Sequence, residues 1–190
     1  MERKTIKWKI LVLLVFVVIQ FTFAACSSNS GEDTEGADSL ADTVKAVWDE
    51  KYDYGTLSVG GEEDVLSNAF FDWKVNSIDT ETSLHGSTAG DGKVFLIINI
   101  SVTNTEDYEY ETGNYEFLCI TGPEESDEVE TMNSFYDEMI PDTVDLAAGD
   151  TLTGDLVFEI SEDVKEVLLD YEEFWSDGST GNTNWFDLSL

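Results

Sequence analysis

The run from residue 93 to 105 (KVFLIINISVTNT) alternates between apolar and polar side chains, and it constrains the fold more than any other feature of the chain. The apolar positions share one face: Val94, Leu96, Ile98, Ile100 and Val102. The polar residues Asn99, Ser101 and Thr103 fall on the other face. A period of two is typical of a β-strand with one buried face, because successive side chains point to opposite sides of a sheet. The chain therefore needs a second layer to cover this strand.

Shorter runs rich in aromatic and β-branched residues predict further strands. They lie at residues 56–59, 70–78, 115–121, 151–160, 166–171 and 184–190. Turn-forming pairs separate them, among them Gly60-Gly61, Gly122-Pro123 and Gly149-Asp150. Many short strands with regular turns favour an all-β fold, an antiparallel β-sandwich of about seven to eight strands over residues 56–190.

Two segments show helical spacing instead. Residues 39–51 are predicted to form one short amphipathic helix with four apolar positions: Leu40, Val44, Val47 and Trp48. The long connection after residue 128 repeats this spacing at Val129, Met132, Tyr136, Met139 and Ile140. A second short helix is therefore predicted to end before Pro141.

Residues 1–25 have the layout of a secretory signal peptide, with a basic start followed by an apolar run. The stretch Phe23-Ala24-Ala25-Cys26 resembles the lipobox of bacterial lipoproteins, in which the cysteine receives a diacylglyceryl group and becomes the first mature residue. We therefore expect a lipidated Cys26 and a membrane anchor, with a secreted or uncleaved form as the alternative. Residues 26–55 then hold this cysteine, an acidic flexible tether and the short helix.

The chain contains 41 acidic and 9 basic residues, for a formal net charge of −32. Such a surface excludes nucleic acid as a partner, because binding phosphate draws on Lys and Arg. The acidity is explained either by solvation outside the cell or in a salty habitat, or by cation binding. Three acidic or polar loops contain oxygen ligands of the kind that calcium prefers: residues 106–111, 124–130 and 177–184. Calcium is kept as a partner hypothesis, with no metal ligand assigned.

Residue types that common catalytic sites need are scarce. His85, the one histidine, lies in a glycine-rich loop, and no HExxH, paired-cysteine or phosphate-loop motif is present. Cys119 lies in an apolar run, where a small buried side chain is expected. A pair of carboxylates could hydrolyse a glycoside, but so many acids make any chosen pair unspecific. No catalytic residue and no cofactor is assigned, and a non-enzymatic protein is expected.

Aromatic residues near the predicted loops have two interpretations. Tyr108, Tyr110, Phe174, Trp175 and Trp185 form either a recognition patch for protein or glycan, or part of the sandwich core. The core interpretation is favoured. Alternation further predicts that one of Trp185 and Phe186 faces inward and the other outward.

The order of these elements is similar to that of a known family. The stretch FDWKVNSID is followed by SVTNTEDYEY, YEFLCITG, LAAGDTLTGDLVFEIS and VKEVLLDYEE. This order resembles the telokin-like, immunoglobulin-like domains of Gram-positive bacterial lipoproteins, a family of domains of unknown function. Two motifs carry the resemblance: Val102-Thr103-Asn104 before a polar turn, and Gly149 and Gly154 before Phe158-Glu159-Ile160. It covers residues 56–190 and implies an immunoglobulin-like β-sandwich, with no catalytic set.

The sequence thus predicts an acidic, immunoglobulin-like module that is displayed outside the cytoplasm, on the outer face of the cell membrane of a Gram-positive bacterium. Loops on a rigid scaffold often carry binding sites, so we expect an unknown protein or ligand to bind there. A calcium-dependent surface module and a carboxylate-based hydrolase are the alternatives.

Overall fold

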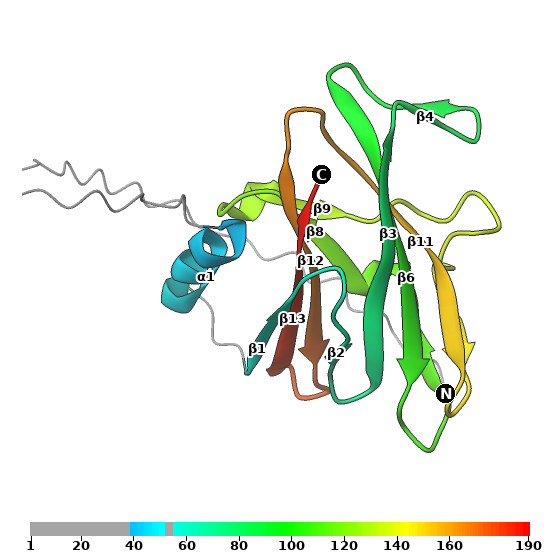
Figure 1. The fold of residues 1–190 in the computed structure, drawn as a ribbon. Coiled ribbons are helices and arrows are strands. Elements are labelled where there is room, and N and C mark those ends of the chain that lie inside the picture. The colour runs from blue at the N-terminus through cyan, green and yellow to red at the C-terminus, as the bar shows by residue number, and fades with distance from the viewer. Residues whose placement is uncertain (1–38, 52–54) are drawn as a thin grey trace, which may run out of the picture. The chain divides into compact units, whose positions relative to one another are not determined.

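Two β-sheets form the domain in the computed structural model, which describes residues 39–51 and 55–190 (Figure 1). The first sheet has the strand order β1 (Leu57–Gly60), β13 (Thr180–Ser189), β12 (Glu166–Phe174), β8 (Phe117–Ile120) and β9 (Glu128–Glu130). The second has the order β11 (Thr151–Ser161), β6 (Lys93–Asn104), β3 (Phe71–Glu81) and β2 (Leu66–Ser67). The predicted all-β sandwich is confirmed. The predicted signal peptide and Cys26 lie outside the described residues.

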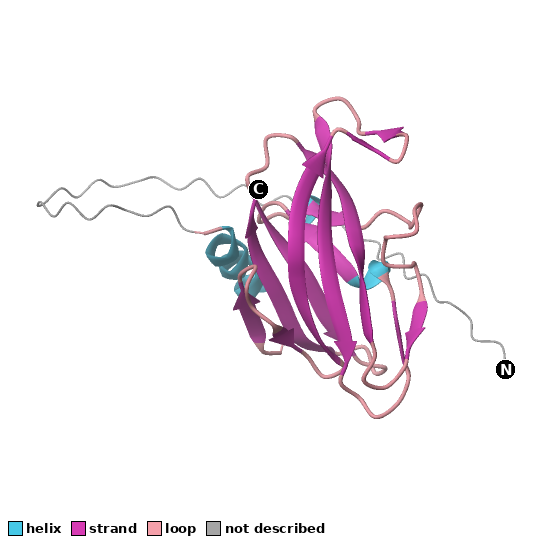
Figure 2. Ribbon diagram, turned by 45° about the vertical axis from the view of Figure 1, so that its right-hand side comes forward, coloured by secondary structure: helices cyan, strands magenta, loops and turns pink. Residues whose placement is uncertain are grey.

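Smaller elements complete the described part of the chain (Figure 2). Two short pairs lie outside the main sheets: β10 (Val144–Leu146) with β7 (Tyr110–Thr112), and β4 (Ser83–Leu84) with β5 (Ser87–Thr88). The helical elements are α1 (Leu40–Lys51) and the 3₁₀ turns η1 (Asn114–Glu116) and η2 (Glu125–Asp127). The strands exceed the predicted seven to eight because several contain only two to four residues. No helix in residues 39–51 and 55–190 is long and apolar enough to cross a membrane.

The core lies between the two sheets and is rich in aromatic rings. Trp73 packs edge-on against Phe186, with ring centroids 4.7 Å apart, and its indole Nε1 donates a hydrogen bond to Asn184 Oδ1. Phe158 and Cys119 are fully buried there, and the burial of Cys119 was predicted. Burial raises the pKa of the Cys119 thiol to about 12, so the side chain acts as a small apolar group.

Strand β6 shows the predicted alternation. The side chains of Leu96, Ile98, Ile100 and Val102 are buried in the core, whereas Asn99, Ser101 and Thr103 lie on the outer face. On that face Ser101 and Thr103 form hydrogen bonds with threonines of β11.

One strand pair departs from the predicted antiparallel arrangement. Strand β1 pairs in parallel with the last strand, β13, from Leu57 opposite Thr183 to Gly60 opposite Phe186. A hairpin would require antiparallel strands, but β1 and β13 lie far apart in the sequence and no hairpin joins them, so they can pair in parallel. The pair covers the edge of β13 that would otherwise expose unpaired backbone groups.

Helix α1 packs on the outer face of the five-stranded sheet, in the range where the amphipathic pattern lies. Its buried residues Val44 and Trp48 contact Leu168 and Trp185, and the rings of Trp48 and Trp185 meet edge-on at 5.1 Å. Phe186 points into the core and Trp185 points outward, as alternation predicts. Trp185 is nevertheless fully buried, because the helix covers it.

The predicted helix ending before Pro141 is wrong. Val129 belongs to β9, and the following residues run irregularly beside β11, where Met132 donates its backbone N–H to Val157 and Ile140 donates to Asp155. Met139 packs with Phe95 and Val157 on the outer face of the four-stranded sheet. Hydrogen bonding to β11 satisfies backbone groups that a helix would have paired internally.

Candidate ligand-binding pocket

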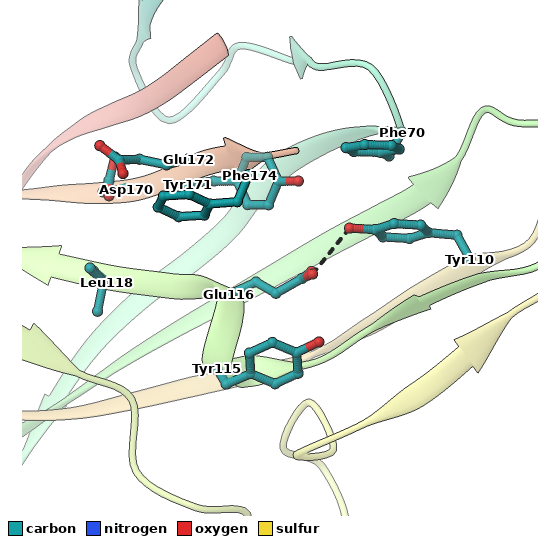
Figure 3. A pocket seen from close by; sticks show the side chains of 9 residues that line it. All are labelled: Phe70, Tyr110, Tyr115, Glu116, Leu118, Asp170, Tyr171, Glu172 and Phe174. Carbon is teal, nitrogen blue, oxygen red and sulfur yellow. Dashed lines mark hydrogen bonds between the residues drawn. The ribbon is translucent and has the colours of Figure 1, made fainter. Parts of the chain in front are cut away.

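A pocket of about 440 Å³ lies beside β8 and β12, where outward residues of the five-stranded sheet meet the loops at one end of the sandwich (Figure 3). Its lining is aromatic and acidic: Phe70, Tyr110, Tyr115, Glu116, Leu118, Asp170, Tyr171, Glu172 and Phe174. Strand alternation explains why Asp170 and Glu172 lie on the outer face of β12. Leu169 and Tyr171 belong to the core, so the residues that follow each of them point the other way.

Asp170 is the most deeply placed acid of the pocket. It is 1% exposed, and its Oδ1 accepts a hydrogen bond of 2.8 Å from the indole Nε1 of Trp185. Burial, followed by the neighbouring Glu172, raises the pKa of Asp170 well above its ordinary value, although the Trp185 bond opposes this shift.

Glu172 and Glu116 are the other two carboxyl groups of the lining. Burial, and then the charge of Glu128, raise the pKa of Glu172. Burial also raises the pKa of Glu116, against hydrogen bonds from Thr112, Tyr110 and the Gly113 backbone that favour its ionised form. The hydroxyl of Tyr110 donates to Oε1 at 3.0 Å, and the hydroxyl of Thr112 donates to Oε2 at 2.6 Å. They fix the orientation of Glu116 and of the Tyr110 ring.

Aromatic rings form the walls and rim of the pocket. Phe70 and Tyr110 stack almost parallel, with centroids 5.0 Å apart, and Trp175 packs on Phe70 at 5.4 Å. Phe174 is 68% exposed and Tyr115 is 57% exposed, so both present ring surface to solvent at the rim. A ligand could therefore contact aromatic rings on entry without a rearrangement of the core.

Glu173 links the segments that carry these rings. Its buried carboxylate accepts hydrogen bonds from the backbone N–H of Ala69, from the backbone N–H of Asn182 and from the Asn182 amide. Ala69 precedes Phe70, and Glu173 itself precedes Phe174. The Glu173 carboxylate thus holds two walls of the pocket together, although it does not line the pocket.

The aromatic residues near the predicted loops differ in their position relative to the pocket. Tyr110 and Phe174 line the pocket, and Trp175 packs against its wall through Phe70. Trp185 lies beneath α1 and supplies the hydrogen bond to Asp170. Tyr108 is exposed and is not among the lining residues.

Sequence reasoning missed the acids of this pocket. Asp170 and Glu172 occupy alternate positions of the run VLLDYEE, where an acid at an outward position among buried neighbours could have drawn attention to it. Glu116 gave no such signal, because its partners Tyr110 and Thr112 come from a separate short strand.

The acidic loops use several of their carboxylates to hold local turns. Glu124 and Asp127 form reciprocal side-chain to backbone hydrogen bonds at η2, and Asp177 accepts hydrogen bonds from the backbone and hydroxyl of Ser179. Within residues 39–51 and 55–190, no group of three or more His, Cys, Asp or Glu side chains is placed to hold a metal ion. His85 stacks on Tyr136, with ring centroids 4.2 Å apart.

Residues 62–180, which include the whole pocket lining, match the model of the family described as a domain of unknown function, DUF4352. The chain belongs to this family. The predicted membership of a family of domains of unknown function is therefore confirmed, and the DUF4352 region spans both sheets. No curated protein matches the chain in sequence.

This DUF4352 chain is similar to solved structures, and it shares its fold with one of them. The candidate lipoprotein ycdA from Bacillus subtilis has a TM-score of 0.56 at 16% identity; the match covers 68% of this chain and 39% of ycdA. The chain thus spans about two fifths of the length of ycdA. An uncharacterised β-sandwich protein from Clostridium difficile 630, CD630_09570, has a TM-score of 0.43 at 14% identity, with 71% of this chain and 97% of that chain covered.

Proposed function

We propose that this chain is a non-enzymatic binding module that is displayed outside the cytoplasm and takes its ligand in the pocket between β8, β12 and the loop of Phe70. A protein or glycan partner at the cell surface would present the bound group, or the ligand would be a free small molecule. The observation that carries this proposal is the pocket itself, in which aromatic rings surround carboxyl groups that have no basic neighbour among the lining residues.

The pocket has the character of a binding site. Its volume of about 440 Å³ falls in the range of small-molecule sites, which are mostly apolar and contain a few placed polar groups. The exposed rings of Phe174 and Tyr115 offer contact area at the rim. The hydrogen bonds to Glu116 and Glu173 preorganise the walls, which lowers the entropic cost of binding.

The acids of the pocket suit binding better than glycoside hydrolysis. A hydrolase of that type keeps one carboxyl protonated and a second ionised, so the two pKa values are pushed apart. Here burial raises the pKa of all three lining acids, Glu116, Asp170 and Glu172. The three pKa values are therefore shifted in the same direction and not pushed apart.

Anchoring through Cys26 to the outer face of the membrane of a Gram-positive bacterium is the second part of the proposal. It rests on the lipobox-like stretch that ends at Cys26 and on the fold that the chain shares with the candidate lipoprotein ycdA. The substitution Cys26→Ala tests it by fractionation of cells that express the full chain. We expect wild-type protein in the membrane fraction and the variant outside it; retention of the variant in the membrane would contradict lipid anchoring.

Ligand binding is tested by thermal unfolding of the wild type and of Phe174→Ala with a mixed panel of cationic, neutral and anionic small molecules. A ligand that binds only the folded state raises the melting temperature with its concentration. We expect at least one class to stabilise the wild type more than the variant. Calcium chloride, chelator and sodium chloride at matched ionic strength complete the panel. If no compound distinguishes the two proteins, the pocket is not a binding site.

A further inference from the structure

The lining of the pocket also specifies which class of ligand fits it, an inference that rests on the proposed binding function. We infer that the pocket binds a small organic cation, in which an ammonium or quaternary ammonium group is attached to a short apolar body. The charged group would lie near Asp170 and Glu172, and the apolar body would contact the aromatic rings.

Charge complementarity gives the sign of the ligand. Three of the lining residues are acids, Glu116, Asp170 and Glu172, and none is Lys, Arg or His. The chain as a whole has a formal net charge of −32, which raises the local concentration of cations and lowers that of anions. An anionic ligand would have to bury its charge beside these acids without a basic partner.

Asp170 gives the position of the charge. Asp170 is almost fully buried and lines the pocket, and the indole of Trp185 bonds to its Oδ1. A buried carboxylate is costly to ionise without an opposite charge beside it, and a cation that pairs with it in the pocket removes that cost. Trp185 already holds Oδ1, so the carboxyl group is oriented before a ligand arrives.

The aromatic rings favour an organic cation over a metal ion. Ammonium groups are attracted to the faces of aromatic rings, and aromatic pockets recognise quaternary ammonium ligands in this way. Phe174, Tyr115 and the stacked pair of Phe70 and Tyr110 supply such rings in the lining of the same pocket. Metal ions such as calcium need several oxygen ligands, and no group of three metal-ligating side chains was found in residues 39–51 and 55–190.

Because acids line the pocket, cation binding should be coupled to the release of protons. Burial makes the lining acids hold their protons more strongly than usual, whereas a bound cation favours their ionised forms. Binding should therefore release protons, and affinity should increase as the pH rises. A neutral ligand that binds through the rings alone would show neither effect.

The experiment is isothermal titration calorimetry of the purified chain with two pairs of probes. Choline is paired with its uncharged isostere, in which carbon replaces the ammonium nitrogen, and protonated butylamine is paired with pentanol. We expect at least one cation to bind about tenfold more tightly than its neutral partner. We also expect its affinity to rise with pH, and its binding heat to depend on the ionisation enthalpy of the buffer.

Three variants locate the binding. Glu172→Gln removes a charge in the pocket with little change of shape, and Phe174→Ala removes an exposed ring, so both should fold. Each is expected to weaken cation binding several-fold. Glu162→Gln makes the same charge change at an exposed site outside the pocket and is expected to leave the affinity unchanged.

The outcomes separate this inference from the proposed function. If neutral probes bind as tightly as their cationic partners and Phe174→Ala abolishes the binding, the cation inference fails and pocket binding stands. Binding of calcium, without binding of either organic cation, would also overturn the cation inference. If no cation binds up to the highest concentration at which ionic strength can be matched, the inference fails, and the mixed panel of small molecules then decides whether the pocket binds any ligand.

Discussion

Gly154 shows how one backbone position limits what β11 can tolerate. A Cβ atom added there would lie 2.8 Å from the carbonyl oxygen of Glu138 and 3.0 Å from the backbone nitrogen of Ile140. The segment that replaces the predicted helix passes close to β11 at this point, so the side chain of alanine has no room. We expect Gly154→Ala to lower the free energy of unfolding by about 1–3 kcal/mol, as overpacking does.

Urea denaturation measures this change, with Gly90→Ala as the matched control. A Cβ at Gly90 would make only ordinary contacts, the nearest at 3.5 Å from Glu159 Oε1. Equal midpoints for both variants would contradict a tight approach at Gly154.

Two substitutions at Asp170 distinguish the effect of its charge on stability from the effect of its hydrogen bond. Asp170→Asn keeps an oxygen that can accept from the Trp185 indole and removes a group that is costly to ionise when buried, so we expect it to be at least as stable as the wild type at neutral pH. Asp170→Ala leaves the indole N–H without its acceptor and should be less stable than Asp170→Asn by about 1–3 kcal/mol. Chemical denaturation of both variants tests the comparison. A strong loss of stability in Asp170→Asn would show instead that the charge itself is stabilising.

Several residues could be interpreted from the sequence because their roles are local. The sequence places Asn104 before a polar turn, and there its Oδ1 accepts a hydrogen bond from the backbone N–H of Glu106. Gly149-Asp150 was predicted to form a turn, and the φ of Gly149 is +77°. Asp170 escaped notice because its role depends on Trp185 in the neighbouring strand, and Glu116 because its role depends on how a short strand and a 3₁₀ turn fold together. An acidic sequence offers no contrast by which to select either residue.

At the scale of elements, strands with one buried face were predictable and the irregular connection was not. Strand β6 alternates because one face packs in the core, and its period is visible in the sequence. Residues 129–140 have helical spacing, yet Met132, Tyr136 and Met139 pack on β6 and β11 along an irregular path. Spacing alone could not distinguish these outcomes, since the neighbouring strand supplies the hydrogen bonds.

Helix α1 should depend on Trp48 for its attachment to the sheet. Trp48 is 7% exposed and packs with Ile120, Leu168 and Trp185, which the helix shields from solvent. We expect Trp48→Ala to lower the free energy of unfolding by about 3–5 kcal/mol, in line with the loss of a large buried ring. Chemical denaturation followed by intrinsic tryptophan fluorescence measures this loss. Lys45→Ala, at an exposed position of the same helix, is the control and should change stability little.

At the scale of the whole molecule, the excess of acids should make stability depend on pH. Burial, then the neighbouring Glu166 and Asp42, raise the pKa of Asp187 to about 6. The unfolded chain releases this proton near pH 3.9, so the native state binds more protons between these values. Stability therefore falls as the pH rises from about 4 to 6 and stays lower above.

We expect the unfolding free energy to be higher at pH 5 than at pH 7, with Asp187 contributing about 1 kcal/mol after allowance for its contact with solvent. Asp187→Asn should flatten this part of the profile, whereas Asp163→Asn at an exposed site should not. Denaturation curves across the pH range test both statements. A profile that rises from pH 5 to pH 7 would contradict the assigned direction.

The parallel pairing of β1 with β13 has a mechanical consequence for a chain that is tethered upstream of residue 57. Tension applied at Leu57 pulls β1 along its own axis, and the hydrogen bonds to β13 between Leu57 and Gly60 then carry the load together in shear. Bonds loaded together resist rupture better than bonds that open one after another, as in a hairpin pulled apart from its open end. Under the anchoring proposed for Cys26, drag on the domain would load this strand pair in shear.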